Sequence, residues 1–434
     1  MKPSPHPSGD AEPATLSPRD RWRTLVGAGL GWTFDGYETY ALVLTLGVSL
    51  PQLLPVEDHD RIPFFAGATI ALTLFGFGLG GIGGGILADR IGRRRTLLVT
   101  VCAYALLTGL TALAWSWWSF AALRLLTGVA LGAEWSTGAT LVAETWPDRL
   151  RSRAVAFMQS GLGVGFFAAA LVWFVIGPLG PGSWRWMFVV GVVPALYALA
   201  VRRRVPASPA WTAQRARART VAVSAPRRST TRRIMADPAL RRMTLLGSVM
   251  SLATTLGWWG VSTFIPQYFA SVTVPLGWEP SRAASVSGMV YTAGGVLGYL
   301  LVGYLAELWG RRPTAAMFFA GAFVITPVVF LWTHTVPLLL VLLFVNGVFT
   351  MGQYAWMAVW LPELYPTSVR ATGIALVFNA SRLLACFGPL VAGSLIVALG
   401  GFGTTATTVG CIYLVGLAVV WLLPETRGKP LPRG

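Results

Sequence analysis

Long apolar stretches alternate with short polar segments along almost the whole chain. Twelve of these stretches reach the length of about 20 residues that a helix needs to cross a bilayer. They cover residues 24–50, 64–88, 96–116, 118–143, 154–177, 184–202, 243–270, 284–308, 313–333, 335–361, 371–399 and 402–423. In lipid, a helix satisfies the backbone polar groups of each segment internally. The pattern therefore predicts an all-α membrane protein with twelve transmembrane helices.

The composition supports a membrane protein and excludes several other classes. Hydrophobic residues make up 54% of the 434 residues and charged residues only 12%, about half the share of roughly 25% in soluble domains. A soluble enzyme, a disordered protein and a disulfide scaffold do not fit these values. The three cysteines and three histidines are scattered without metal-ligand spacing, so we expect no metal site.

The charge is strongly basic and unevenly distributed. The chain has 34 Lys and Arg against 17 Asp and Glu, a net charge of +17. Most of the basic residues fall in the tail 1–23, the second, fourth and later even-numbered connections, the stretch 203–242 and the tail 424–434. The positive-inside rule then places both termini in the cytoplasm and the chain in the cell (inner) membrane. We expect no nucleic-acid partner, because no soluble basic face is present.

Two motifs occur twice, at nearly the same separation along the chain. The pairs are Gly85-x-x-x-Asp89 with Gly303-x-x-x-Glu307, and Glu144-x-x-Pro147-x-x-x-Arg151 with Glu363-x-x-Pro366-x-x-x-Arg370. The repetition predicts two pseudo-symmetric six-helix bundles, residues 24–202 and 243–423, joined by a basic cytoplasmic linker, 203–242. A parallel duplication of this kind is typical of transporters that bind their substrate between the halves.

These motifs resemble those of the major facilitator superfamily over nearly the whole chain. The segment 85–95 resembles the loop signature of the superfamily, and the segments 362–373 and 424–428 resemble sugar-porter signatures. Asp35-Gly36-Tyr37-Glu38 is similar to the first helix of aromatic-acid/proton symporters. The run 132–147 is more similar to sialate/proton symporters. The resemblance thus implies the major facilitator fold and leaves two subfamilies open.

The resemblance implies secondary active transport by alternating access, and no enzymatic activity. We expect proton-coupled uptake of a small organic anion, either an aromatic acid or a sugar acid, by a monomer in the lipid bilayer. A proton antiporter that exports a metabolite or drug, and a sugar/proton symporter, remain alternatives. The proton is the coupling ion, and no other cofactor is expected.

Charged residues inside the predicted spans are the candidates for proton coupling, because burying charge in a bilayer is costly. Asp35 and Glu38 lie one turn apart in the first span, at a depth matching that of Arg124 in the fourth. We expect Asp35, rather than Glu38, to carry the proton and Arg124 to tune it. Glu134 is a possible second protonation site. A static buried ion pair is the structural alternative.

Arg382 near the middle of the eleventh span is the candidate anchor for a substrate carboxylate, because a guanidinium binds a carboxylate with two hydrogen bonds. Helix–helix hydrogen bonding is the alternative role. Polar and aromatic side chains at similar depth are candidates for contact with a planar substrate, although core packing is the favoured role for each of them taken singly. They are Asn379, Trp258, Trp259, Tyr291, Gln353, Tyr354 and Gln159.

The signature loops carry acids and arginines at the predicted cytoplasmic ends of helices. The family resemblance implies that they close this side in one state and separate in the other. A solvated charge cluster is the alternative. The gating candidates are Asp89, Arg93, Arg94, Glu144, Arg151, Glu307, Arg311, Glu363 and Arg370.

Overall fold

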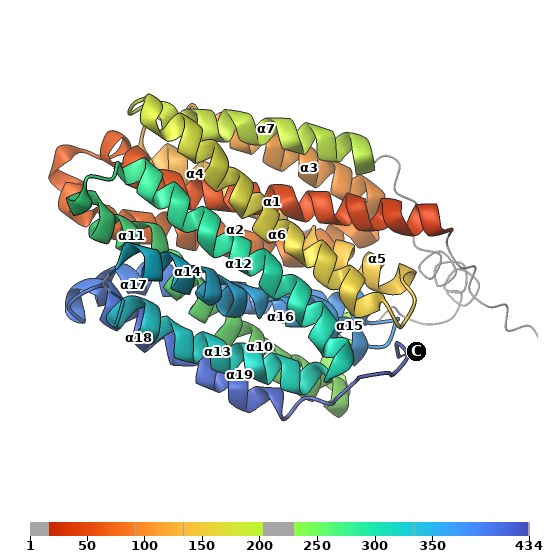
Figure 1. Ribbon diagram of the computed structural model, residues 1–434. Coiled ribbons are helices and arrows are strands. Elements are labelled where there is room, and N and C mark those ends of the chain that lie inside the picture. The colour runs from red at the N-terminus through yellow and green to blue at the C-terminus, as the bar shows by residue number, and fades with distance from the viewer. Residues whose placement is uncertain (1–16, 92, 133, 203–229, 334, 433–434) are drawn as a thin grey trace, which may run out of the picture.

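The computed structural model describes residues 17–91, 93–132, 134–202, 230–333 and 335–432, and helices account for the regular structure of this part. The helices lie roughly along one direction, as Figure 1 shows. Both the start of α1 and the C-terminus lie at the same end of the bundle. The predicted all-α fold is confirmed.

The first half contains six helical spans. It begins at Pro18, where the Ser17 side chain caps the first turn of α1 by accepting from the Asp20 N–H at 3.2 Å. The helix α1 therefore begins inside the predicted tail 1–23, a few residues before the predicted start of the first span at residue 24. The spans are α1 (Pro18–Leu53), α2 (Ile62–Ile91), α3 (Arg93–Thr111), α4 (Trp117–Gly132) with α5 (Trp135–Thr145), α6 (Arg151–Ile176) and α7 (Ser183–Arg202).

The second half repeats this order. A short helix, α9 (Thr230–Ala236), and the first turn of α10 occupy the end of the range expected as a linker. The rest of that linker, residues 203–229, lies outside the described residues. The spans are α10 (Pro238–Ser262) with α11 (Ile265–Thr273), α12 (Pro280–Leu308), α13 (Arg311–Leu331), α14 (Val336–Gly352) with α15 (Ala355–Leu364), α16 (Arg370–Ala385) with α17 (Phe387–Ala398), and α18 (Phe402–Gly410) with α19 (Ile412–Val420).

Several predicted spans consist of two helices in series, which the apolar pattern does not reveal. Tight turns separate them: the N–H of Tyr354 bonds to the carbonyl of Met351, and the N–H of Trp356 to that of Gln353. Such three-residue spacing is that of a 3₁₀ turn, a frequent site of bending in a helix. The α14/α15 junction corresponds by repetition to the α4/α5 junction, so the bend belongs to the duplicated unit.

The two halves meet along two equivalent seams. In one, α6 of the first half packs on α12 of the second; in the other, α2 packs on α16 and α17. Because α2 corresponds to α12 and α6 to α16 in the repeat, a pseudo-twofold axis exchanges the two seams. The centre of the molecule therefore lies between α1, α2 and α6 on one side and α10, α12 and α16 on the other.

Glycines allow the closest helix contacts inside each half. A Cβ added at Gly76 or Gly128 would overlap a backbone carbonyl oxygen of the facing helix, in the α2–α4 contact. Gly294 and Gly347 make the same contact between α12 and α14. Small residues permit such backbone approach in membrane bundles. The repeat is therefore visible in packing as well as in sequence motifs.

Six helical segments among the described residues are long and apolar enough to cross a membrane by themselves. The remaining predicted spans are shorter, interrupted or charged. Their polar groups are covered by neighbouring helices of the bundle. The six are Val56–Gly84, Arg151–Leu179, Pro280–Leu308, Arg311–Leu331, Val336–Leu364 and Phe402–Val420.

Candidate transport site

A buried ion pair lies inside the first half. An Nη1 hydrogen of Arg124 in α4 is donated to Oε1 of Glu38 in α1, and both side chains are fully enclosed, with 1% and 4% exposure. The guanidinium also donates to the hydroxyls of Thr111 and Thr127, and lies 4.8 Å from the ring centre of Phe188. These contacts compensate much of the cost of burying the positive charge of Arg124.

The ion pair corrects the expected partner of Arg124. The sequence matched Arg124 in depth with both acids and favoured Asp35, but the arginine binds Glu38. Asp35 lies on another side of α1, where it lines a cavity between the halves. Glu134 is buried at the junction of α4 and α5, and it is not among the residues that line this cavity.

Removing one member of the Glu38–Arg124 pair should destabilise the protein. Arg124→Leu leaves a buried carboxylate without its partner, and this costs about 3–5 kcal/mol. The double variant Glu38→Gln/Arg124→Leu removes both charges and should recover most of that loss. Thermal unfolding in detergent measures the difference. Equal melting temperatures for wild type and Arg124→Leu would show that the pair does not hold α1 to α4.

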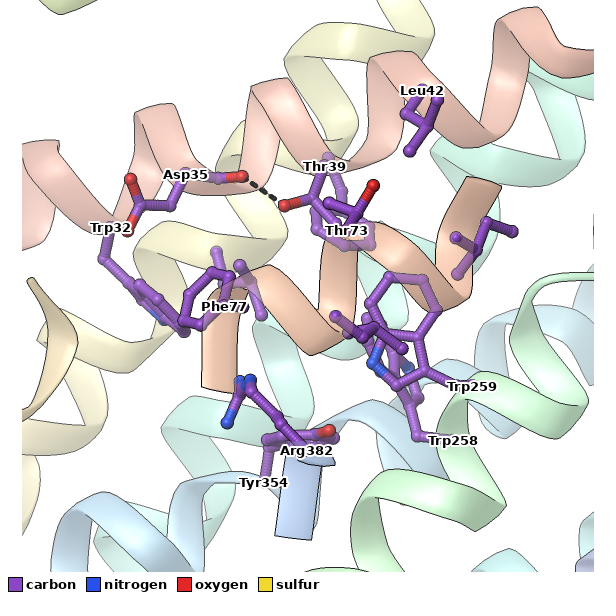
Figure 2. Close-up of a pocket in the computed structure, with 14 residues that line it drawn as sticks. Trp32, Asp35, Thr39, Leu42, Thr73, Phe77, Trp258, Trp259, Tyr354 and Arg382 are labelled. Atoms are coloured by element: carbon purple, nitrogen blue, oxygen red, sulfur yellow. Dashed lines mark hydrogen bonds between the residues drawn. The ribbon is translucent and has the colours of Figure 1, made fainter. Parts of the chain in front are cut away.

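A cavity of about 30 Å³ lies between the halves, close to the middle of α1. Its lining is mainly aromatic and aliphatic, with one acid and one base, and Figure 2 shows these side chains around it. The first half contributes Trp32, Asp35, Thr39, Leu42, Ile70, Thr73, Leu74, Phe77, Leu162 and Phe166, and the second half contributes Trp258, Trp259, Tyr354 and Arg382.

Arg382 is held between two rings at the cavity. Its guanidinium carbon lies 3.5 Å from the ring centre of Phe378 and 4.8 Å from that of Phe77, which belongs to the other half. Within the described part of the chain, its one hydrogen bond runs from Nη1 to the Phe378 carbonyl at 3.1 Å. A guanidinium has five N–H donors. Arg382 therefore retains donors for a ligand in the cavity.

Asp35 is the acid of the same cavity. It is 1% exposed and lines the cavity together with Arg382. Its backbone carbonyl accepts a hydrogen bond from the Thr39 hydroxyl at 2.7 Å, drawn in Figure 2. The cavity thus contains one carboxyl group and one guanidinium within an apolar wall, where charges interact strongly.

Half of the eight predicted substrate-contact residues line the cavity. Besides Arg382 they are Trp258, Trp259 and Tyr354. The other four pack nearby without lining it: Tyr291 accepts from Trp258 Nε1 at 2.8 Å, Gln159 accepts from Trp135 Nε1 at 2.8 Å, and Asn379 and Gln353 donate to helix carbonyls. In the described conformation these four side chains pack against other helices and do not line the cavity.

Sequence reasoning missed the lining residues of the first half other than Asp35. Trp32 could have been found, because it lies three residues before Asp35 and therefore near the same helix face. Phe77 and Thr73 on α2 gave no signal, since they belong to an uninterrupted apolar stretch. Only the packing of α2 against α16 brings Phe77 to Arg382.

Two ion pairs related by the internal repeat connect the halves at the end of the bundle where the C-terminus lies, called here the ion-pair end (right in Figure 1). Glu144 binds Arg370 at 3.1 Å, and Glu363 binds Arg151 at 3.8 Å. The acids and the bases are each related by the internal repeat, so the second pair is the symmetry copy of the first. Arg151, Glu363 and Arg370 are buried and Glu144 is partly buried, and together they join α5 to α16 and α15 to α6.

Further contacts extend this network. Arg311 binds Glu363 at 2.7 Å and donates to the Ser152 hydroxyl at 2.8 Å across the halves. Glu307 pairs with Arg153 at 2.6 Å, joining α12 to α6. The side chains of the remaining gating candidates, Asp89, Arg93 and Arg94, lie outside the described residues.

The segment after the last helix is tied into the same end. Burial alone would raise the pKa of Glu425, but hydrogen bonds from the backbone N–H groups of Arg311, Arg312, Thr426 and Arg427 hold that pKa below its usual value. Two of these groups, in Arg311 and Arg312, open helix α13, whose free N–H groups favour a carboxylate. Thr426 donates to Glu363 at 2.5 Å. The tail therefore covers the ion pairs.

Two six-helix halves, a cavity between them and a layer of ion pairs across one end define a membrane transporter of the major facilitator fold. The chain belongs to the sugar (and other) transporter family, whose model matches residues 57–433. It is a transporter and not an enzyme, as the sequence predicted.

Known relatives agree with this assignment. The chain is 31% identical to a putative metabolite transport protein of Haemophilus influenzae, over 94% of this chain and 98% of that one. It is 30% identical to the cis,cis-muconate transport protein of Acinetobacter baylyi (84% and 86%) and to the 3-(3-hydroxyphenyl)propionate transporter of Escherichia coli (81% and 83%). The proton:xylose symporter XylE, bound to a bromodeoxyglucose, superposes with a TM-score of 0.78 at 20% identity, covering 96% of this chain and 98% of that one.

Proposed function

We propose that the protein is a proton-coupled symporter that takes up a small organic anion with a planar or apolar body. The observation that carries this proposal is the position of Arg382, whose donors face an aromatic cavity that also contains Asp35. Low dielectric makes one guanidinium an effective anchor for one carboxylate. The aromatic wall fits an unsaturated or ring-shaped body.

The relatives support this substrate class. Two of them are named for muconate and for 3-(3-hydroxyphenyl)propionate, both carboxylates attached to a planar unsaturated or aromatic group. A sugar acid needs many hydrogen-bond partners for its hydroxyls. The cavity offers two threonines and a tyrosine among fourteen lining residues, which favours the aromatic or unsaturated acid.

The size of the cavity supports alternating access. The cavity has a volume of about 30 Å³, whereas ligand pockets are typically about 300–1,000 Å³. The described conformation therefore has too little room for an organic acid, which can bind there only if the halves move apart. The ion pairs Glu144–Arg370 and Glu363–Arg151 hold one end shut, so entry in this state would occur from the other end.

Asp35 is the proposed proton carrier. Glu38 already forms a buried ion pair with Arg124 inside the first half, so it is assigned to packing of α1 on α4. Asp35 and Arg382 line the same cavity, and a substrate carboxylate would also approach Arg382. A second negative charge in this cavity favours the neutral, protonated form of Asp35. Anion binding and proton binding at Asp35 would thus occur together.

We propose that the ion-pair end faces the cytoplasm, with both termini in the cytoplasm and the chain in the cell (inner) membrane. The excess of basic residues in the tails and in the connections at that end supports this orientation. Each half covers the other along both seams, and we propose that the monomer is the functional unit. The proton is the coupling ion, and we propose that no other cofactor takes part.

Uptake into proteoliposomes tests the proposed function. Benzoate, cis,cis-muconate, a sialic acid, xylose and a cationic dye are compared with and without an inward proton gradient. We expect the gradient to stimulate uptake of benzoate or muconate and to leave xylose and dye unaffected. Empty liposomes provide the control for passive entry of the protonated acid. Uptake of xylose or dye without acid uptake would overturn the organic-anion proposal.

A further inference from the structure

A continuous stack of flat groups crosses the boundary between the halves beside the cavity. The rings of Trp135 and Phe378 lie 3.5 Å apart and within 14° of parallel. The guanidinium carbon of Arg382 lies 3.5 Å from the ring centre of Phe378 and 4.8 Å from that of Phe77. Trp135 and Phe77 belong to the first half, and Phe378 and Arg382 to the second. The ring centre of Trp32 lies 6.0 Å from that of Trp135 and 6.3 Å from that of Phe378.

The stack lies between the cavity and the ion pairs. On α16, Phe378 follows Arg370 by eight residues and precedes Arg382 by four. Along the helix it is therefore about 12 Å from Arg370 of the ion pair and about 6 Å from Arg382 of the cavity. Trp135 precedes Glu144 by nine residues on the other half, about 14 Å along α5. Both halves thus place a ring at the same depth.

A polar contact fixes the tryptophan. Its indole Nε1 donates to Gln159 Oε1 on α6 at 2.8 Å, and both side chains are fully buried. A buried amide that accepts an indole hydrogen restricts the ring to one orientation. Gln159 therefore holds the face of Trp135 against Phe378 and does not contact the cavity.

We propose that Trp135 and Phe378 form an inner barrier of the transport path toward the ion-pair end, and that Arg382 couples this barrier to the charge in the cavity. A cation over an aromatic face stabilises the ring where it lies. When an anion neutralises the guanidinium, that attraction weakens and Phe378 can leave Trp135 at lower cost. Phe378 is thus a positioning residue for Arg382 and a barrier at once.

The inference depends on the proposed function only for the identity of the anion, so it can be tested without any substrate. Cys102, Cys386 and Cys411 are replaced by serine, and Thr73→Cys supplies one reporter on the cavity wall. A small membrane-impermeant thiol reagent is applied from each side of vesicles of both orientations. The rate of labelling from the ion-pair end measures how often the barrier opens.

Phe378→Ala should raise labelling from the ion-pair end by about tenfold, the size of effect expected for loss of an aromatic stack. Gln159→Met keeps the volume of the side chain and removes the acceptor, and it should raise the same rate by a smaller factor. Arg382→Ala should also raise it, because the cation no longer holds Phe378. Phe387→Ala is the matched control, since its ring is 59% exposed on the outside of α17.

The side of labelling separates a barrier from general loosening. A barrier predicts faster labelling from the ion-pair end alone, whereas a loosened bundle would react faster from both ends. If Phe378→Ala and Gln159→Met label no faster than Phe387→Ala, the barrier is overturned. If only Arg382→Ala behaves like the control, the coupling to Arg382 is overturned. If the wild-type protein takes up no organic acid, the proposed function is refuted, and the labelling results still test the barrier.

Discussion

Uptake of organic acids is expected to fall by about thirtyfold or more when Arg382 is replaced by alanine. The guanidinium is buried, and removal of one partner of a buried charge pair costs about 2–5 kcal/mol, which corresponds to roughly 30-fold to several-thousand-fold in affinity. Binding can be followed by the change in intrinsic tryptophan fluorescence, since Trp32, Trp258 and Trp259 line the same cavity. Uptake of labelled benzoate into proteoliposomes gives the transport rate.

An uncharged analogue separates an anchor from a structural role. Benzamide has the shape of benzoate without its charge, so its binding should change little in Arg382→Ala. Arg382→Lys keeps the positive charge and loses the flat fork that stacks on Phe378 and binds a carboxylate with two bonds, and an intermediate loss is expected. Equal loss of benzoate and benzamide binding would contradict the anchor.

Asp35→Asn is expected to abolish accumulation of the acid against its gradient while exchange continues. Asparagine is nearly isosteric but cannot take up a proton, so the cavity would hold the anion with no change of protonation. Counterflow of labelled against unlabelled acid should persist, because it requires only reorientation of the loaded site. Acidifying the outside should then no longer increase the final internal concentration.

Glu38→Gln is the matched control, one turn away on the same helix. It should lower stability through the loss of the pair with Arg124 and preserve the response to a proton gradient in the protein that remains folded. The reverse pattern, with accumulation preserved in Asp35→Asn and lost in Glu38→Gln, would assign the proton to the Arg124 pair.

The sequence predicted the architecture well because lipid imposes simple rules. Span lengths, the distribution of arginine and the repeated motifs each depend on one dimension, the position along the chain. The depths of Glu38 and Arg124 likewise follow from counting residues at 1.5 Å each. Their pairing confirms that reasoning, while the preference for Asp35 as the partner of Arg124 was wrong.

The error has a geometric cause. Residues three apart on a helix differ by about 60° in direction, enough to place Asp35 in the cavity and Glu38 inside the first half. Rotation of a helix about its own axis is set by packing against several neighbours, which no local pattern encodes. The stack of Trp135 on Phe378 was missed for the same reason, since it joins residues from different halves. Gln159 showed only that an amide lies at interior depth.

The ion pairs Glu144–Arg370 and Glu363–Arg151 have the geometry of a self-complementary contact. Each half presents one acid and one arginine to the other, as the two copies do in a twofold-symmetric dimer. A single six-helix half could therefore close one end of a path by associating with a second copy of itself. Fusion of the halves into one chain frees each pair to change separately, and their distances of 3.1 and 3.8 Å already differ.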